Sequence, residues 1–190
     1  MRMLLLIYIQ DSSSLSKKLL YLQLRAFKQY YNKAILVSPV ELAGYDGYNI
    51  EWRTELFPCK TGGSIVSIAQ TSKEPIYYCN NNYLVFENPS LIETDSLIVS
   101  KYEIPYPVVD SKQQFVYRMR TKCFSNEEVF IQHALFKPET IKRYIRKDVG
   151  TVEEVLEDVL PRHIIKIHRY KGKWYYITSE EQLEAVGLRV

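Results

Sequence analysis

The first part of the chain changes from one hydrophobic periodicity to another and back again. Met3–Ile9 is a continuous apolar run, which is typical of a buried central strand of a parallel sheet. Ser12–Ser14 then provides a helix start signal, and apolar residues recur at helical spacing over Leu15–Tyr31. Ala34–Val37 is a second short apolar run. Strand, helix and strand in this order predict a βαβ unit with parallel strands.

The middle of the chain is predicted to be mostly strands after a loop and a short helix. Residues 41–61 contain Gly44, Asp46-Gly47 and Pro58, so we expect a loop there. The segment Thr61-Gly62-Gly63-Ser64 introduces a short helix. Further strands are predicted at Pro75–Cys79, Ser96–Val99 and Phe115–Met119, whereas the pattern over Asn126–Phe136 fits either a helix or a strand.

The last third of the chain carries clear helix caps. A helix is predicted from Pro138 to Arg146, and another from Thr151 to Leu160, where Thr151 and Glu154 form a capping box. The β-rich runs His163–Tyr170 and Lys173–Thr178 predict a hairpin that turns at Lys171-Gly172, after which Thr178 caps a final helix with Glu181 at its third position, ending near Gly187. The order of elements predicts a three-layer α/β/α fold with a Rossmann-like mixed sheet, and a single domain over residues 1–190.

Composition narrows the classes of function. The formal charge of +3 suits an anionic ligand but gives no specific signal for nucleic acid. No stretch reaches the roughly 18 apolar residues of a membrane span, and the apolar start lacks a cleavage pattern. Cys59, Cys79 and Cys123 form no CxxC pair, so we expect reduced thiols and a cytoplasmic location. The histidines have no zinc-ligand spacing, and no nucleophile-elbow sequence occurs.

Two stretches resemble the sugar-phosphate nucleotidyltransferases and the related molybdenum-cofactor guanylyltransferases. In the first, Gly62-Gly63-Ser64-Ile65 is followed by Pro75–Cys79 and then Asn80-Asn81-Asn82; the family has a small-residue turn, a helix, and a strand ending in an Asn-Gly-Asp-like tripeptide. In the second, Thr151–Pro161 followed by Lys173–Leu183 resembles the family's closing strand and helix, where a Trp-x-Asp-x-Gly/Asn-Thr segment precedes the last helix. The likeness covers most of the chain in order, but only these two stretches match closely.

The resemblance implies a nucleotide-diphospho-sugar transferase fold of the GT-A type and a site built for phosphates. In that chemistry a phosphate oxygen of the acceptor attacks the α-phosphorus of a nucleoside triphosphate, while a divalent cation, backbone N–H groups and basic side chains stabilise the charge. Mapped onto this chain, Ser12, Ser13, Ser14 and Lys18 would contact phosphates, Gly62 and Gly63 the nucleoside, and Asn80 and Asn82 a phosphate or a residual metal.

The chain departs from the family at the positions that carry the chemistry. Asn82 stands where the family has its first metal aspartate, and Tyr176 where it has the second. An amide oxygen brings no charge to Mg²⁺ or Mn²⁺, and a phenol is a poor ligand. The loop after the first strand also lacks the family's glycines and contains Asp11, which would repel phosphate. Any use of Mg²⁺ or Mn²⁺ is therefore expected to be weak, and the catalytic residues stay unassigned.

The leading hypothesis is a diverged nucleotidyltransferase-like protein that binds a nucleotide or nucleotide sugar, with weak or lost catalysis. One alternative is a GT-A type glycosyltransferase that uses a nucleotide-sugar donor, with Arg118, Arg120 or Lys122 stabilising the leaving diphosphate. Another is a non-catalytic interaction protein on the same fold. Basic residues on a predicted helix and hairpin either form a binding face or are simply solvated; they are Lys142, Arg143, Arg146, Lys147, Arg162, Lys166, Arg169, Lys171 and Lys173. The oligomeric state is left open.

Overall fold

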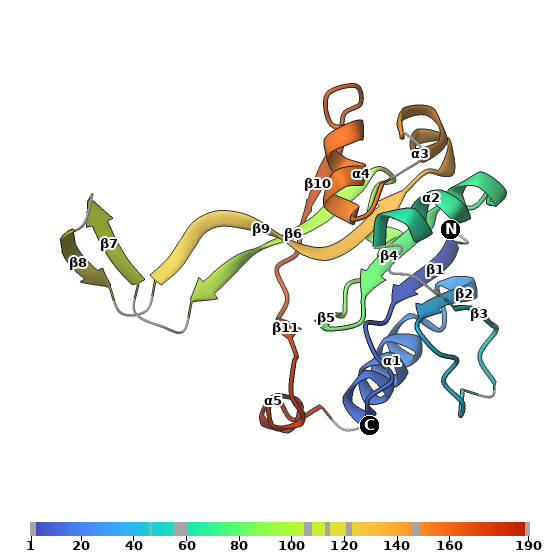
Figure 1. Ribbon diagram of the computed structural model, residues 1–190, viewed down its shortest axis with the longest axis horizontal. Helices are drawn as coiled ribbons and strands as arrows, with labels where there is room; N and C mark the ends of the chain where they lie inside the picture. Colours follow the sequence, from blue (N-terminus) through green and yellow to red (C-terminus); the bar gives the residue numbers. More distant parts are fainter. Residues whose placement is uncertain are drawn as a thin grey trace.

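Strands and helices alternate through the first part of the chain, and the middle of the chain consists mostly of strands (Figure 1). The structure is a computed structural model that describes residues 3–45, 47–54, 61–104, 108–112, 115–120, 123–145 and 149–188. In chain order the elements are β1 (Met3–Tyr8), α1 (Ser14–Phe27), β2 (Tyr31–Ser38), β3 (Ile50–Thr54), α2 (Thr61–Thr71), β4 (Ile76–Asn80), β5 (Tyr83–Val85), the 3₁₀ turn η1 (Pro89–Leu91), β6 (Ser96–Ile104), β7 (Val108–Lys112), β8 (Phe115–Arg120), β9 (Cys123–Phe136), α3 (Pro138–Tyr144), α4 (Val152–Val159), β10 (Lys166–Arg169), β11 (Trp174–Tyr176) and α5 (Glu180–Ala185).

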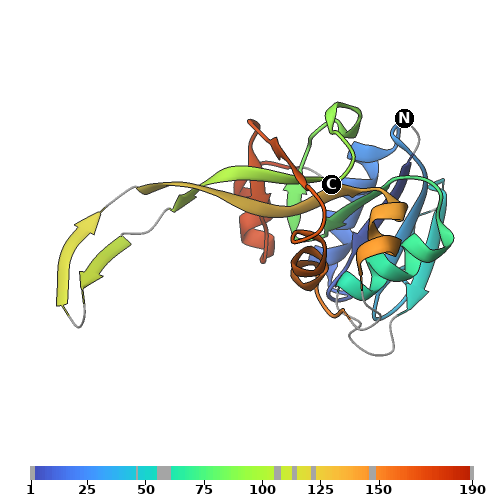
Figure 2. The same cartoon turned by 90° about the horizontal axis from the view of Figure 1, so that it is seen from above.

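A mixed seven-stranded sheet forms the centre of the described structure, in the order β10-β6-β9-β4-β1-β2-β3. Strand β1 pairs in parallel with β2 and β4, as the predicted βαβ unit requires. Strand β9 runs antiparallel to β4 and β6, and β10 runs parallel to β6. Strands β6 and β9 continue away from the sheet as a long two-stranded arm that leads to β7 and β8 (Figures 1 and 2).

Helices cover both faces of the sheet, which confirms the three-layer prediction. On one face α1 packs Leu24 and Phe27 against Leu5 of β1. On the other face α2, α3 and α4 pack against residues such as Leu6 and Tyr78. Because successive side chains of a strand point to opposite faces, neighbouring leucines of β1 belong to different layers.

The C-terminal segment is held against α1 by a third, smaller hydrophobic cluster. Ile177, just after β11, and Leu183 of α5 are buried together with Leu19, Leu22 and Leu84. Strand β11 pairs antiparallel with β5, which follows directly on the turn after β4. The end of the chain is thereby brought to the carboxyl ends of β1 and β4.

Several sequence-based predictions need correction. The segment 41–61 contains strand β3, because Ile50–Thr54 pairs with β2, so it is not all loop. The predicted hairpin at Lys171-Gly172 is wrong, since β10 pairs with β6 and β11 with β5.

Other boundaries were settled by the structure. The ambiguous segment Asn126–Phe136 belongs to the strand β9. The N-cap of α5 is Ser179 instead of Thr178, whereas the capping box of α4 is confirmed. Cys59, Lys122, Arg146 and Lys147 lie outside the described residues. Within the described part of the chain, no helix has the length and apolar character needed to cross a membrane.

Candidate functional site

The loop after β1 turns its polar groups towards its own aspartate. The Oδ1 atom of Asp11 accepts hydrogen bonds from the Ser13 backbone N–H at 2.9 Å and from the Ser16 hydroxyl at 2.6 Å. Ser13 caps α1 by accepting from the Ser16 N–H. The bonds from Ser13 and Ser16 hold the pKa of Asp11 below its usual value. A carboxylate of the chain itself therefore uses donors at the start of α1 that would otherwise face an anionic ligand.

A second carboxylate contacts the residues of α1 that were predicted to bind phosphate. Glu180, the first residue of α5, forms an ion pair with Lys18. The bond from Lys18, together with a weaker one from Ser14, lowers the pKa of Glu180. Both side chains of the ion pair are more than a third exposed, so the pair contributes little to stability. Ser14 and Lys18, both predicted to bind phosphate, thus already contact the carboxylate of Glu180. Ser12 is exposed beside them.

The three asparagines after β4 are tied into the surrounding backbone. Asn80 is the last residue of β4, and its Oδ1 accepts from the Asn82 N–H at 3.1 Å. Asn81 is fully buried; its Nδ2 donates to the Ser16 carbonyl and its N–H to the Tyr8 carbonyl, both at 2.9 Å. This turn is therefore locked to the end of β1 and to the first turn of α1.

The structure brings positions 82 and 176 together. The Asn82 carbonyl accepts from the Ile177 N–H at 2.9 Å, and Asn82 Nδ2 donates to the Ile177 carbonyl at 3.0 Å. Tyr176 lies opposite Tyr83 across the β5–β11 pair, with ring centroids 4.7 Å apart. The two stretches that resemble the nucleotidyltransferases thus meet at a single point, although they are far apart in sequence.

The side chains at this meeting point provide little charge for a cation. Asn82 offers an amide and Tyr176 a phenol, and no group of three His, Cys, Asp or Glu side chains in the described residues could hold a metal ion. The Oδ1 atoms of Asn81 and Asn82 are buried, and neither accepts a hydrogen bond from a described residue. Amide oxygens can coordinate Mg²⁺, but a carboxylate normally supplies most of the attraction. The donor set therefore fits Mg²⁺ or Mn²⁺ poorly.

A buried glutamine, not predicted from the sequence as a site residue, donates hydrogen bonds to the backbone of this turn. Gln23 of α1 is 1% exposed, and its Nε2 donates to the carbonyls of Asn80, Asn81 and Tyr83 at 3.1–3.3 Å. Its Oε1 accepts from the Cys79 thiol at 3.1 Å. The available signal was a lone amide within the leucine-rich stripe of α1, since a polar side chain there must find partners.

His133 of β9 completes the buried support. Its Nε2 lies 2.8 Å from the Tyr83 carbonyl, which can only accept, so this nitrogen carries the proton. Its Nδ1 then accepts from the Tyr77 hydroxyl at 3.1 Å. Full burial lowers the pKa of His133 to about 4 and keeps the ring neutral. Burial likewise raises the pKa of the Cys79 thiol well above its usual value, and Cys79 is a free cysteine in the core.

The two glycines of the first stretch lie in the first turn of α2. Gly62 is buried against the loop that precedes α4, and an added Cβ would overlap the carbonyl oxygen of Thr151. The Gly62 N–H also donates to the Gly150 carbonyl at 3.3 Å. Close packing of α2 on this loop therefore explains the glycine at position 62, whether or not Gly62 and Gly63 contact a nucleoside.

Other candidates from the sequence have structural partners. Glu93 pairs with Lys166, and Asp95 is 5% exposed, accepting from the Lys137 N–H and the Thr140 hydroxyl at 2.9 Å. Asp95 therefore stabilises the start of α3. Arg118 and Arg120 belong to β8, and nothing in the described part of the structure tests their role.

Solved structures with the same architecture include cytidylyltransferases. HddC from Yersinia pseudotuberculosis is 15% identical with a TM-score of 0.60, covering 96% of this chain and 97% of that one. CTP:phosphocholine cytidylyltransferase (LicC) from Streptococcus pneumoniae is 11% identical with a TM-score of 0.63, covering 98% of both chains. The 2-C-methyl-D-erythritol 4-phosphate cytidylyltransferase from Thermus thermophilus is 10% identical with a TM-score of 0.61, covering 96% and 97%.

The chain has the nucleotidyltransferase-like nucleotide-diphospho-sugar transferase fold. No protein-family model and no curated protein matches the sequence. At identities this low, the similarity establishes the fold, and the activity has to be argued from the site itself.

Proposed function

We propose that this protein binds the phosphate groups of a nucleotide or nucleotide sugar at the carboxyl ends of β1 and β4, with weak or lost catalysis. The observation that carries the proposal is the position of Glu180. Its carboxylate contacts Ser14 and Lys18 at the start of α1, as the phosphate of a ligand would. Helix N-termini and lysines are suited to anions, and ligands of open α/β sheets bind at the carboxyl ends of the strands.

The second part of the proposal, weak or lost catalysis, rests on charge. Efficient nucleotidyl transfer needs strong stabilisation of negative charge on the transferring phosphate. Here Asn82 and Tyr176 supply no negative charge to hold a cation, and Asp11 adds a repulsive carboxylate close to the start of α1. A bound nucleotide would meet polar and basic groups of α1 without the carboxylates that recruit a metal ion.

The test is a thermal-shift screen of the full chain against nucleoside triphosphates and nucleotide sugars, each with and without Mg²⁺. We expect at least one of these ligands to raise the Tm, because a ligand that binds only the folded state stabilises it by mass action. A shift with a nucleotide sugar, but none with a triphosphate, would favour a glycosyltransferase. The proposal fails if no ligand shifts the Tm.

A matched pair of variants locates the binding site. Glu180→Gln removes the carboxylate that lies on Lys18, whereas Glu181→Gln removes a charge from the neighbouring residue of the same helix, whose carboxylate bonds to Ser179 at the cap of α5. We expect Glu180→Gln to increase the nucleotide-induced shift and Glu181→Gln to leave it unchanged. Equal responses of the two variants would place the ligand away from Lys18.

A further inference from the structure

Strongly exposed apolar side chains gather around β10, the strand at one edge of the seven-stranded sheet. Leu91 is 66% exposed, Leu160 53%, Ile164 82% and Ile167 52%. These are four of the seven large apolar side chains that are strongly exposed in the described residues. Single exposed apolar residues are common, whereas a group of them around one strand is typical of an interaction site.

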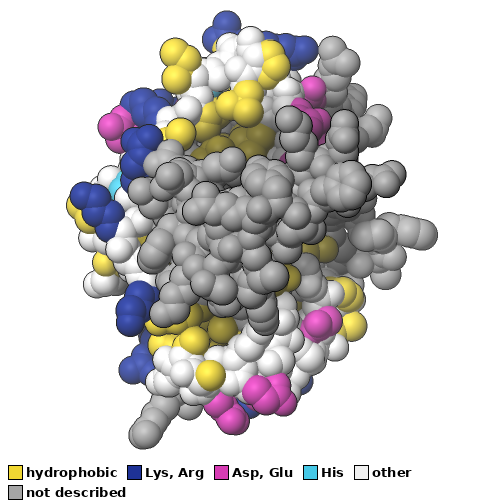
Figure 3. All heavy atoms as spheres, turned by 90° about the vertical axis from the view of Figure 1, so that its left-hand side faces the viewer, with side chains coloured by type: hydrophobic (Ala, Val, Ile, Leu, Met, Phe, Trp, Pro, Cys, Tyr) yellow, Lys and Arg dark blue, Asp and Glu magenta, His cyan; other side chains and the backbone are white. Residues whose placement is uncertain are grey.

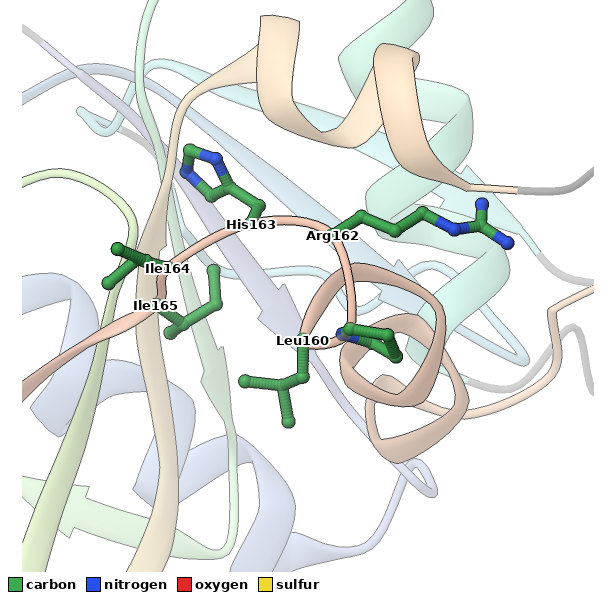
Figure 4. A pocket seen from close by; sticks show the side chains of 6 residues that line it. Leu160, Arg162, His163, Ile164 and Ile165 are labelled. Carbon is green, nitrogen blue, oxygen red and sulfur yellow. The ribbon is translucent and has the colours of Figure 1, made fainter.

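Two open pockets adjoin the same strand. One, of about 560 Å³, is lined by residues 160–165 in the turn between α4 and β10. The other, of about 490 Å³, extends along β10 itself and is bounded on the far side by Leu91 and Glu93. Both pockets include Ile165. Figure 4 shows Leu160 and Ile165 on the same side of the turn, while Arg162 extends away from them. The two pockets share Ile165 and so adjoin each other, and together they form a depression beside β10.

At this edge the main chain of β10 presents hydrogen-bonding groups that no strand of the described residues uses. The Lys166 N–H donates to the Asp95 carbonyl at 2.8 Å, and the Tyr170 N–H to the Val99 carbonyl at 2.9 Å. In a parallel ladder, alternate residues bond to the same neighbour, so the N–H and C=O of Ile167 point away from β6. No strand of the described residues pairs with that side of β10. An edge of this kind can accept an added strand.

The charges around the depression are mainly positive. Arg162, Lys166 and Arg169 lie on β10 and the turn before it, and Lys171 and Lys173 follow β10. The nearby acids are already paired, Glu93 with Lys166 and Glu87 with His168. In Figure 3, dark blue Lys and Arg side chains alternate with yellow hydrophobic ones along the left-hand margin of the surface. The complementary partner is therefore acidic as well as apolar.

A second copy of this chain is a poor occupant of the same edge. Pairing of β10 with the β10 of another copy would bring two basic edges together, each carrying Lys166 and Arg169, and like charges repel each other. The net charge of +3 works in the same direction. We propose that the β10 edge binds an extended, acidic segment of another protein as an added strand, with apolar side chains of that segment in the two pockets.

The test uses random peptides of about nine residues displayed on phage, a length that spans a strand. The full chain is the bait, and binders of the variant Ile164→Asp are removed by counter-selection, since Ile164 is 82% exposed and its replacement spares the fold. We expect enriched peptides to alternate apolar residues with Asp or Glu. Failure to enrich peptides that depend on Ile164, or enrichment of basic ones, overturns the proposal.

A matched pair of variants at one position then tests strand addition. Ile167→Pro removes the outward N–H without removing a hydrogen bond to β6, and proline is accepted on strand edges of this kind. Ile167→Ala keeps the N–H and shortens the side chain. For an enriched peptide, fluorescence anisotropy should show binding weakened about tenfold more by proline than by alanine, because main-chain bonds supply much of the affinity in strand addition.

Electrostatics and oligomeric state provide further tests of the β10 edge. If Ile167→Pro unfolds the chain, two other measurements test the proposal. Added salt should weaken the binding of an acidic peptide, and so should the charge reversal Arg162→Glu. A concentration-dependent dimer in sedimentation that Ile164→Asp abolishes would assign the edge to a second copy and overturn the proposed partner. Nucleotide-induced thermal shifts are independent of all these results.

Discussion

The turn after β4 and the edge at β10 handle polar and apolar groups in opposite ways. Around the turn, carbonyls, amides and hydroxyls are bonded to groups of the same chain, chiefly through Gln23, Asn81 and His133. At the β10 edge, main-chain groups face outward and isoleucines are exposed. The comparison teaches that a region resembling known transferases can use most of its hydrogen-bonding groups within the chain itself, with the buried amide oxygens of Asn81 and Asn82 as exceptions among the described residues. The region with no recognisable motif is the one left open.

The largest effect is expected from removing the glutamine under the turn. Gln23→Leu keeps the shape of the side chain but leaves the carbonyls of Asn80, Asn81 and Tyr83 without a buried donor. We expect a loss of about 3 kcal/mol in the free energy of unfolding, measured by urea denaturation. The exposed Gln70 of α2 provides the control, since Gln70→Leu should change stability by less than about 0.5 kcal/mol. Similar results for the two variants would show that the turn does not depend on Gln23.

Burial of neutral His133 should make the free energy of unfolding depend on pH. The pKa of His133 is about 4 when folded and about 6.5 when unfolded, so between these values the unfolded chain binds the extra proton. The stabilising contribution is therefore present above pH 6.5 and is lost as the pH falls towards 4. Between pH 7 and pH 5 we expect the free energy of unfolding to fall by about 2 kcal/mol. Urea titrations at these two pH values measure this loss, and a flat profile would mean that His133 is charged when folded.

Restoring carboxylates should make the turn behave more like those of metal-dependent transferases. In the double variant Asn82→Asp, Tyr176→Asp, we expect Mg²⁺ to strengthen nucleotide binding by about tenfold, or about 1.4 kcal/mol, as measured by calorimetry. Asn88→Asp, at the cap of the 3₁₀ turn, adds charge at another place and should have no such effect. If the double variant binds nucleotide without a contribution from Mg²⁺, positions 82 and 176 do not correspond to the family's metal site.

The smallest effect on stability is expected at the open edge. Ile164→Ser should change the free energy of unfolding by less than about 0.5 kcal/mol, because the side chain is 82% exposed. Ile177→Ser, at a position that is 2% exposed beside the turn, should cost about 3 kcal/mol or more. Thermal or urea unfolding of the two variants measures the contrast directly. A large loss from Ile164→Ser would show that the β10 edge is part of the core.

Local patterns in the sequence predicted much of the fold. The apolar run of β1, the helical stripe of α1 and the capping box of α4 each depend on a few neighbouring residues, and each was confirmed. The pairing of β10 with β6 could not be predicted in the same way. It joins segments separated by the arm and two helices, whereas Lys171-Gly172 offered a plausible local turn.

The candidate site was predicted in outline only. The sequence placed Asn80–Asn82 at the end of a buried strand, and the resemblance related position 82 to position 176, which the structure brings together. It could not predict that Gln23, Asp11 and Glu180 would satisfy the surrounding groups, because their partners depend on how α1 and α5 pack. Side chains that act through tertiary packing leave little trace in local sequence.

The double hydrogen bond between Asn82 and Ile177 also bears on how fast a ligand could enter. It fixes β11 beside the turn, and Leu183 holds α5 in the hydrophobic cluster on α1. Glu180 can therefore leave Lys18 by rotation of its own side chain, without separation of the two helices. Exposed side chains rotate within picoseconds to nanoseconds, far faster than segments move. Exchange of Glu180 for an incoming phosphate would then be limited by diffusion and not by a conformational change.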